Sequence, residues 1–325
     1  MLPSSSPRPI RVGVLDDYQG VAERYADWAS LPRASKVRFF HDHASAEDAL
    51  VERLAPFEAL VAMRERTPFT ASLLRRLPNL KLLVTTGARN AAIDLAAAAE
   101  LGITVSGTRG LPYPTAELTW ALILGLARKI AQEDRALRGG AWQTTVGSGL
   151  SGKTLSVLGL GRLGTQVARI GKAFGMQVIS WSPHLTAQRA NEAGVELVTQ
   201  DALLERADVL TVHLVLSEST RGLLGARQLS RLKPSALLVN TSRGPLVDEV
   251  ALAAALRAGA LGGAALDVFD VEPLPENHVL RSAPNTLLTP HLGYVTDETY
   301  RVFYSDALEA IHAYLGGSPV RVLSA

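Results

Sequence analysis

Two series of short apolar segments, each alternating with helical stretches, constrain the fold of this chain more than any other feature. We predict the first series as the strands Arg11–Leu15, Val37–Phe40, Ala59–Met63, Leu80–Thr85 and Thr104–Ser106. We predict the second as Thr154–Leu158, Gln177–Trp181, Val195–Val198, Val209–Leu216, Ala236–Asn240, Gly263–Leu266 and Thr286–Thr289. Because strands that alternate with helices form parallel sheets covered by those helices, the pattern predicts an α/β protein with two parallel-sheet domains.

Composition agrees with two domains and excludes several classes of protein. The chain has 325 residues, of which 47% are hydrophobic, enough for two separate cores. Its 33 Lys and Arg against 31 Asp and Glu are spread along the chain, so we do not expect nucleic acid as a partner. The absence of cysteine excludes disulfides and thiolate metal sites, and we predict no metal.

Neither a secretion signal nor a membrane span is expected. Met1–Ile10 is rich in Ser and Pro and has no apolar signal-peptide region, so we interpret it as a frayed terminus of a cytoplasmic protein. The most apolar helical run, Trp120–Ala127, stops at Arg128 and Lys129, well short of the ~20 residues that a span requires.

Two further segments indicate how the domains connect. Thr115–Arg138 is predicted as one long helix that starts at a Pro-Thr-Ala-Glu signal and ends before two glycines. Asp297–Tyr314 is predicted as a helix that returns to the first domain, because no strand follows it. We therefore expect a discontinuous substrate domain and an inserted dinucleotide-binding domain, with boundaries at 1–107 plus 295–325 and at 108–294.

A glycine motif, Gly159-Leu160-Gly161-Arg162-Leu163-Gly164, lies between an apolar strand and the predicted helix Thr165–Phe174. Glycines at this spacing allow a tight turn, close approach of the backbone to a pyrophosphate, and close packing of helix on strand. The start of the helix would direct its unpaired N–H groups at the anion. The motif therefore predicts a Rossmann-type dinucleotide site.

The expected ribose position leaves the choice of dinucleotide open. Such sites usually carry an acid about 20 residues after the glycines, but this chain has Ser182 there, followed by Pro183 and His184. Without a carboxylate to repel it, a 2′-phosphate could bind Ser182 or His184. Ser182 could equally bond the ribose of NAD, so the cofactor is NAD or NADP.

Three segments place chemical groups directly after predicted strands, where open α/β sheets form their ligand crevice. They are Asn240–Gly244, Asp267–Pro273 and Thr289–Gly293. Taken singly, Arg243 could be a surface cation, Glu272 a loop carboxylate and His291 a packed imidazole. Only their joint occurrence beside the glycine motif favours a catalytic site.

Arg243, Glu272 and His291 in this order, with the glycine motif, resemble the D-isomer-specific 2-hydroxyacid dehydrogenase family, which includes glyoxylate/hydroxypyruvate reductase and phosphoglycerate dehydrogenase type enzymes. The resemblance extends to the Pro-Thr-Ala-Glu-Leu helix start, to Val247-Asp248-Glu249 and to Pro-His-x-Gly. It implies two Rossmann-like or flavodoxin-like domains with the active site in a cleft between them.

The resemblance also implies roles for individual residues. Arg243 would hold the carboxylate and carbonyl oxygens of a 2-oxoacid, His291 would exchange the proton, and Glu272 would orient His291 and raise its pKa. The resemblance adds to the cofactor-binding residues Thr115, Arg162, Leu163, Thr241 and Asp267. The glycine motif and the ribose position already indicate Gly159, Gly161, Gly164, Ser182 and His184. The implied substrate-binding residues are Arg64, Thr86, Gly87 and Arg243.

Some of these residues have alternative interpretations. Thr115 could cap a helix, and Asp267 could form a turn at a strand end. The loop around Gly87 departs from the family pattern, because Arg89 and Asn90 stand where a glycine and an aspartate are commoner.

Two histidine-containing segments are not assigned chemistry. His41-Asp42-His43 is interpreted as a solvated loop rather than a metal site, and His213 as a packed strand residue near the adenosine.

The sequence thus predicts an NAD(P)-dependent D-2-hydroxyacid dehydrogenase that acts as a 2-oxoacid reductase on a small substrate. A formate- or phosphite-type dehydrogenase and a nucleotide-sensing, corepressor-like binding protein are the alternatives. The resemblance also implies a homodimer paired through the region of Thr115–Arg138.

Overall fold

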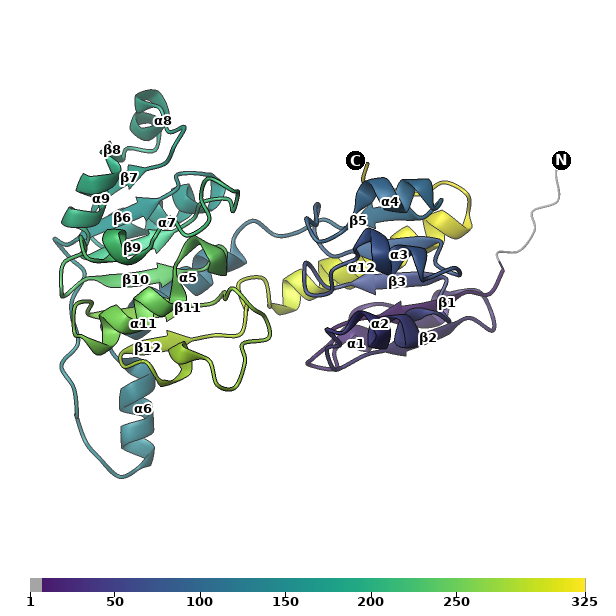
Figure 1. Ribbon diagram of the computed structural model, residues 1–325, viewed down its shortest axis with the longest axis horizontal. Helices are drawn as coiled ribbons and strands as arrows, with labels where there is room; N and C mark the ends of the chain where they lie inside the picture. The colour runs from purple at the N-terminus through teal and green to yellow at the C-terminus, as the bar shows by residue number, and fades with distance from the viewer. Residues whose placement is uncertain (1–7, 325) are drawn as a thin grey trace. The chain divides into compact units, whose positions relative to one another are not determined.

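The computed structural model describes residues 8–324, so the predicted frayed terminus Met1–Ile10 lies largely outside the described residues. The chain divides into two compact units. The first contains the chain up to Leu111 and from Thr296 onward, and the second runs from Pro112 to Val295. Each contains one all-parallel sheet (Figure 1), which confirms the predicted fold class.

The first unit is built on a five-stranded sheet of order β2-β1-β3-β4-β5. Its strands are β1 (Arg11–Val14), β2 (Lys36–Phe39), β3 (Ala59–Ala62), β4 (Leu82–Thr85) and β5 (Thr104–Gly107). The inner strands β3 and β4 are buried along their whole length, and the inner strand β1 is buried except at Arg11, as expected for parallel strands covered on both faces. All five strands of the first series are confirmed, with ends that differ by one or two residues.

The helices of the first unit come from both ends of the chain. They are α1 (Ala22–Tyr25), the 3-10 helix η1 (Trp28–Ser30), α2 (Glu47–Leu54), α3 (Ala71–Arg75), α4 (Leu95–Glu100) and α12 (Asp297–Leu315). The last of these packs against β4 and α1, and the Tyr25 hydroxyl donates a hydrogen bond to Asp297 at 2.7 Å. The final helix therefore belongs to the first unit.

The second unit is built on a seven-stranded sheet of order β12-β11-β10-β9-β6-β7-β8. Its strands are β6 (Thr154–Leu158), β7 (Gln177–Trp181), β8 (Glu196–Leu197), β9 (Val209–Val212), β10 (Leu237–Asn240), β11 (Gly263–Leu266) and β12 (Thr286–Leu288). Successive residues of a strand belong to different hydrophobic clusters. Val209 and Val239 belong to one cluster, and Leu210 and Leu238 belong to the other. Both faces are covered, which explains the continuous apolar runs.

Helices of the second unit cover this sheet. They are α5 (Pro114–Ala127), α6 (Ile130–Arg138), α7 (Arg162–Ala173), α8 (Ala187–Glu192), α9 (Gln200–Arg206), α10 (Ala226–Leu229), η2 (Gly244–Leu246), α11 (Glu249–Arg257) and η3 (Val279–Ser282). Helix α5 packs on β10, β11 and β12 and against α7. Helix α7 begins three residues before the predicted start at Thr165.

The prediction of a single helix over Thr115–Arg138 is wrong. Lys129 adopts a left-handed backbone with φ of 53°, which ends α5 and starts α6. The two helices have different surroundings: Trp120 and Ile123 of α5 are buried, whereas no residue of α6 is. The break at Arg128 and Lys129 therefore coincides with the end of the buried apolar run.

Candidate functional site

The candidate site lies at the carboxyl edge of the second unit's sheet. Its side chains follow β6, β9, β10, β11 and β12, which lie side by side in the sheet. In a parallel sheet the carboxyl ends of all strands meet at one edge, and the crevice forms where the strand order reverses. Here that reversal lies between β6 and β9.

Glycines shape the turn from β6 into α7. Gly159 has a φ of +101°, a left-handed backbone that favours glycine. A Cβ on Gly164 would lie 2.0 Å from the Gly159 carbonyl oxygen, whereas a Cβ on Gly161 would meet nothing within 4 Å. Gly164 therefore allows α7 to pack closely on β6, and Gly161 leaves open space in front of the start of α7.

Helix α7 presents its first turn to that space. Gly161 is its N-cap and provides no side-chain cap, so the first backbone N–H groups face outward with the positive end of the helix dipole. Arg162 is exposed beside them, and Leu163 is half-buried. This cradle fits the pyrophosphate of a dinucleotide.

His213 lies next to the cradle, one residue beyond the end of β9. The predicted strand to Leu216 is therefore too long. Its Nε2 lies 2.8 Å from the Thr211 hydroxyl oxygen, while its buried Nδ1 has no hydrogen-bond partner within residues 8–324. Burial lowers the pKa of His213 to about 3, so the ring is neutral and its Nδ1 could bond a ribose hydroxyl. This orphaned atom is a second feature that fits a dinucleotide.

The turn after β7 adds a cation that the sequence reasoning missed. Ser182 is half-buried and His184 exposed, both directly after the strand. From α8, the Arg189 guanidinium reaches back to 3.4 Å from the Leu160 carbonyl oxygen in the glycine loop. Counting residues from the last glycine of the motif could not identify Arg189. Its side chain comes near the glycine loop only because the chain folds back after β7.

His291 and Glu272 form a closely bonded pair. His291 Nδ1 lies 2.6 Å from Glu272 Oε2, and the two side chains are 23% and 30% exposed. Burial would raise the pKa of Glu272, but its hydrogen bond to His291 and the charges of His291 and Arg243 outweigh it and lower that pKa. His291 has a φ of 56°, an uncommon backbone for a side chain of this size.

Arg243 lies in the loop after β10 and is held by that loop. The Asn240 amide donates to the Arg243 carbonyl at 2.9 Å, and Arg243 Nη1 donates to the Ser242 carbonyl at 2.8 Å. The structure thus brings Arg243, Glu272 and His291 to one edge, with the Arg243 charge acting on Glu272.

Asp267 connects the end of β11 to the segment that carries His291. One carboxylate oxygen accepts from the Thr289 hydroxyl at 2.6 Å and the Leu292 N–H at 2.7 Å, and the other accepts from the Gly293 N–H at 2.8 Å. Burial raises the pKa of Asp267 despite these bonds. An ionised carboxylate has about four acceptor positions, so one remains for a cofactor amide.

Thr115 and Thr241 lie in a chain of hydroxyl contacts. Thr115 donates to the Gly293 carbonyl at 2.8 Å, and Thr119 lies 2.8 Å from the Thr241 hydroxyl. Tyr113, not Thr115, is the N-cap of α5, so the capping interpretation of Thr115 is wrong. Thr119 was not singled out from sequence, although it follows Thr115 by one helical turn.

In the first unit, the structure brings Arg64, Thr86 and Gly87 together after β3 and β4. The Thr86 hydroxyl accepts the Arg64 N–H at 2.9 Å, and the Gly87 N–H donates to the Thr108 hydroxyl at 2.6 Å. A Cβ on Gly87 would lie 2.0 Å from Arg64 Nη1, so this guanidinium covers the glycine. Their role in binding substrate stays a prediction.

His41, Asp42 and His43 have separate partners. His41 Nδ1 lies 2.9 Å from the Asp17 carbonyl, Asp42 pairs with Arg53 at 2.6 Å, and His43 Nδ1 lies 2.9 Å from Asp16. Over residues 8–324, no group of three His, Cys, Asp or Glu side chains is placed to hold a metal ion.

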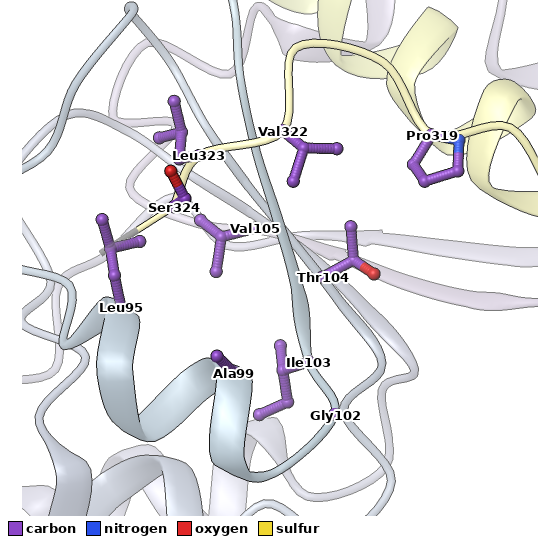
Figure 2. A pocket seen from close by; sticks show the side chains of 10 residues that line it. All are labelled: Leu95, Ala99, Gly102, Ile103, Thr104, Val105, Pro319, Val322, Leu323 and Ser324. Carbon is purple, nitrogen blue, oxygen red and sulfur yellow. The ribbon is translucent and has the colours of Figure 1, made fainter.

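A hollow of about 380 Å³ lies elsewhere in the first unit, between α4, β5 and the last residues of the chain (Figure 2). Its lining is mainly apolar, with Thr104 and Ser324 contributing hydroxyl groups. It contains no titratable side chain and is not a candidate for catalysis. No helix within residues 8–324 combines the length and apolarity that crossing a membrane requires.

Comparison with known proteins gives a consistent result. Residues 120–293 match the family model described as D-isomer specific 2-hydroxyacid dehydrogenase, NAD binding domain. A glyoxylate reductase of Aeropyrum pernix is 41% identical over 75% of this chain and 76% of its own length. A D-3-phosphoglycerate dehydrogenase of Bacillus subtilis is 39% identical over 85% of this chain, which spans about half (52%) of that relative.

Solved structures agree with the sequence relatives. The crystal structure of a phosphoglycerate oxidoreductase from Vibrio cholerae is 39% identical, with a TM-score of 0.90, and the match covers 95% of this chain and 100% of that one.

Proposed function

The chain belongs to the D-isomer-specific 2-hydroxyacid dehydrogenase family, and from that premise we propose that it reduces small 2-oxoacids to D-2-hydroxyacids. The observation that carries the proposal is the 2.6 Å contact between His291 Nδ1 and Glu272 Oε2. The pair lies within the electrostatic influence of Arg243 and at the same sheet edge as the glycine cradle. The named relatives are reductases and dehydrogenases, which does not favour the corepressor-like and formate- or phosphite-type alternatives.

Residues of the second unit would hold the cofactor. Gly159, Gly161 and Gly164, with Arg162 and Leu163, would hold the pyrophosphate, and Thr115, Thr241 and Asp267 would surround the nicotinamide end. When bound, the nicotinamide supplies or accepts the hydride.

His291 and Arg243 act on the substrate. The guanidinium of Arg243 can bind a carboxylate and a carbonyl oxygen with paired N–H groups. His291 Nδ1 is occupied by Glu272, so Nε2 faces the substrate and gives its proton to the carbonyl oxygen during reduction. The hydrogen bond between Nδ1 and Glu272 orients the imidazole ring, so that Nε2 is presented to the substrate.

A substrate panel tests this proposal. Purified protein is incubated with NADH or NADPH and with 2-oxoacids of increasing size, starting with glyoxylate, hydroxypyruvate and pyruvate. We expect oxidation of the nicotinamide with at least one of them, followed at 340 nm. The absence of turnover across the panel, with cofactor binding shown independently, would contradict the assignment.

For the choice of cofactor, we propose that NADPH binds more tightly than NADH. No carboxylate follows β7 at Ser182 to His184, and the Arg189 guanidinium lies against the glycine loop, where it can pair with a 2′-phosphate. Nucleotide fluorescence titration gives both affinities. Arg189→Gln should weaken NADPH about tenfold and leave NADH unchanged, while equal loss of both would place Arg189 outside the phosphate site.

For the substrate, we propose that the loop of the first unit at Thr86 and Gly87 contributes to carboxylate binding with Arg64. Arg64→Gln should raise KM for the 2-oxoacid and leave the KM for the nicotinamide unchanged. Equal effects on both constants would argue against a substrate contact.

For assembly, we propose a homodimer in which a second copy covers α6 and the segment after it. This part extends away from the sheet of its own unit (Figure 1). It exposes large apolar side chains: Ile130 56%, Leu137 57%, Trp142 77% and Val146 91%. Sedimentation should give a dimer mass for the native chain and a monomer for Leu137→Ser with Trp142→Ser, and a native monomer at all concentrations would overturn it.

A further inference from the structure

The turn from Asp267 to Pro273, which carries Glu272, has two successive backbone N–H groups bound by carboxylates. The Phe269 N–H donates to Glu272 Oε1 at 2.9 Å. The next N–H, that of Asp270, donates to Glu249 Oε1 at 3.0 Å. The first carboxylate belongs to the turn itself, whereas the second comes from the start of α11 and is an independent anchor.

Glu249 has its own histidine partner. Its Oε2 lies 3.1 Å from His278 Nε2, and the side chains are 9% and 20% exposed. The Leu280 N–H donates to His278 Nδ1 at 3.4 Å, so Nε2 carries the hydrogen that is donated to Glu249. The arrangement repeats the Glu272–His291 pair on the adjacent amide, but in a more buried position.

The opposite side of the turn is fixed by backbone packing. A Cβ on Gly244 would lie 1.9 Å from the Phe269 carbonyl carbon and 2.4 Å from the Asp270 nitrogen. Gly244 follows Arg243 directly, so the loop that carries Arg243 lies against the same two residues. The turn is thus held between this loop and Glu249.

We propose that Glu249 is a positioning residue for the site: by binding the Asp270 amide, it fixes the turn that presents Glu272 to His291, and His278 holds Glu249 in place. The catalytic meaning of this proposal rests on the proposed function, while its structural part does not. In this proposal Glu249 acts through the turn, by way of its bonds to the Asp270 N–H and to His278.

The effect of substituting Glu249 depends on the charged groups around the Glu272–His291 and Glu249–His278 pairs. His291 is faced by Glu272 and Asp267, and Arg243 acts on Glu272. Glu249 is faced by His278 and Asp270.

Arg221 lies 3.7 Å from Asp270 at the exposed side of the turn.

Burial raises the pKa of Glu249, so its negative charge depends on the two donors, the Asp270 N–H and His278. In Glu249→Gln the new amide group would turn a donor toward His278 Nε2 or toward the Asp270 N–H, which removes one of the two bonds.

The test is an NMR pH titration of the His291 ring in the ligand-free protein, with the resonance assigned by its loss in His291→Gln. We expect Glu249→Gln to lower the His291 midpoint by about half a pH unit or more, because Glu272 moves away from the ring. Asp248→Ala is the matched control: Asp248 caps the same helix by accepting from Val250 and Ala251 but does not touch the turn. Its midpoint should equal that of the native protein.

His278 gives a second pair of variants if Glu249→Gln does not fold. His278→Leu removes the donor to Glu249 and should lower the His291 midpoint. His278→Gln retains a donor and should restore it. An unchanged midpoint in Glu249→Gln and His278→Leu, or an equal shift in Asp248→Ala, would overturn the proposal.

An activity arm separates this inference from the proposed function. With a 2-oxoacid that is turned over, the alkaline limb of kcat for reduction should move to lower pH in Glu249→Gln by the same interval, with KM for the nicotinamide unchanged. A midpoint shift without any reductase activity in the native protein would refute the proposed function and leave the positioning role standing. Reductase activity in the native protein without a midpoint shift in Glu249→Gln would support the proposed function and refute the positioning role of Glu249.

Discussion

The carboxyl edges of the two sheets carry similar residue types with different burial. After β1 in the first unit, Asp16 and Asp17 are 2% and 1% exposed. Asp16 accepts from the Thr67 hydroxyl at 2.7 Å and contacts His43 Nδ1 at 2.9 Å. In the second unit, the Glu272 and His291 side chains are 30% and 23% exposed.

The comparison shows that the position in the fold does not by itself produce chemistry. Both edges offer a carboxylate beside a histidine at the end of a parallel strand. In the first unit the Asp16 carboxylate is enclosed and bonds Thr67 and His43, so it joins segments that are far apart in the sequence. In the second unit one histidine nitrogen is held by Glu272 while the ring stays accessible, which general acid–base catalysis requires.

The largest expected effect comes from replacing the histidine at each of the two sheet edges by glutamine. His291→Gln should lower kcat for 2-oxoacid reduction about 10²–10⁴-fold, because the proton donor is lost, with little change in melting temperature. His43→Gln, in the first unit, should do the opposite: a stability loss of about 1 kcal/mol with kcat retained. Steady-state kinetics and thermal unfolding of both variants decide it, and similar behaviour of the two would refute the contrast.

The next effect separates the glycines of the cradle. Gly161→Ala meets no atom within 4 Å, so it should fold normally and weaken nicotinamide dinucleotide binding about tenfold or more by occupying the pyrophosphate space. Gly164→Ala would place a Cβ 2.0 Å from the Gly159 oxygen and should cost about 1–3 kcal/mol of stability. Fluorescence titration and urea unfolding measure the two effects, and a Gly161→Ala variant with native affinity would argue against the cradle.

A carboxylate of the first unit should affect stability alone. Asp306 is 1% exposed and accepts three bonds from Arg109, at 2.8 Å from its N–H and at 3.0 and 2.7 Å from its guanidinium. Burial would raise the pKa of Asp306, but the Arg109 bonds lower it. Asp306→Asn should cost about 1–2 kcal/mol near neutral pH, since the Arg109 side chain is largely exposed.

The pH dependence of that loss follows from the sign of the shift. A carboxyl whose folded pKa is lowered contributes its stabilisation fully above its ordinary pKa of 3.8, and this contribution is lost as the pH falls through the folded pKa. The difference in unfolding free energy between Asp306→Asn and the native protein should therefore shrink in acid. A difference that stays constant down to the acid limit would contradict the ionised pair.

The smallest expected effect concerns the enclosed edge itself. Thr67→Val removes the hydroxyl that donates to Asp16 and should cost about 1 kcal/mol, measured by urea unfolding at neutral pH. The kcat of the proposed reaction should not change. A reduced kcat would show that this edge also acts in catalysis.

Much of the fold could be predicted because the strands are continuous apolar runs. All twelve predicted strands occur, and inner strands such as β3, β4, β6 and β9 are buried along their whole length, which leaves a strong local signal. The helix break at Lys129 was missed because helical periodicity continues through it, and the extension of the strand beyond Val212 was predicted wrongly because Leu214 and Leu216 keep the segment apolar. The prediction that Thr115 is an N-cap was wrong because the start of α5 depends on the backbone geometry at Tyr113.

By itself, the sequence determined the parallel α/β architecture, the glycine turn into α7, and the order of Arg243, Glu272 and His291, since periodicity and spacing are local properties. Only the tertiary structure decided which groups meet: Arg189 against the glycine loop, Asp267 on the segment of His291, and Glu249 on the Asp270 amide. These contacts join residues from different elements. Their distances and burial depend on how the chain packs, which no local pattern of residues encodes.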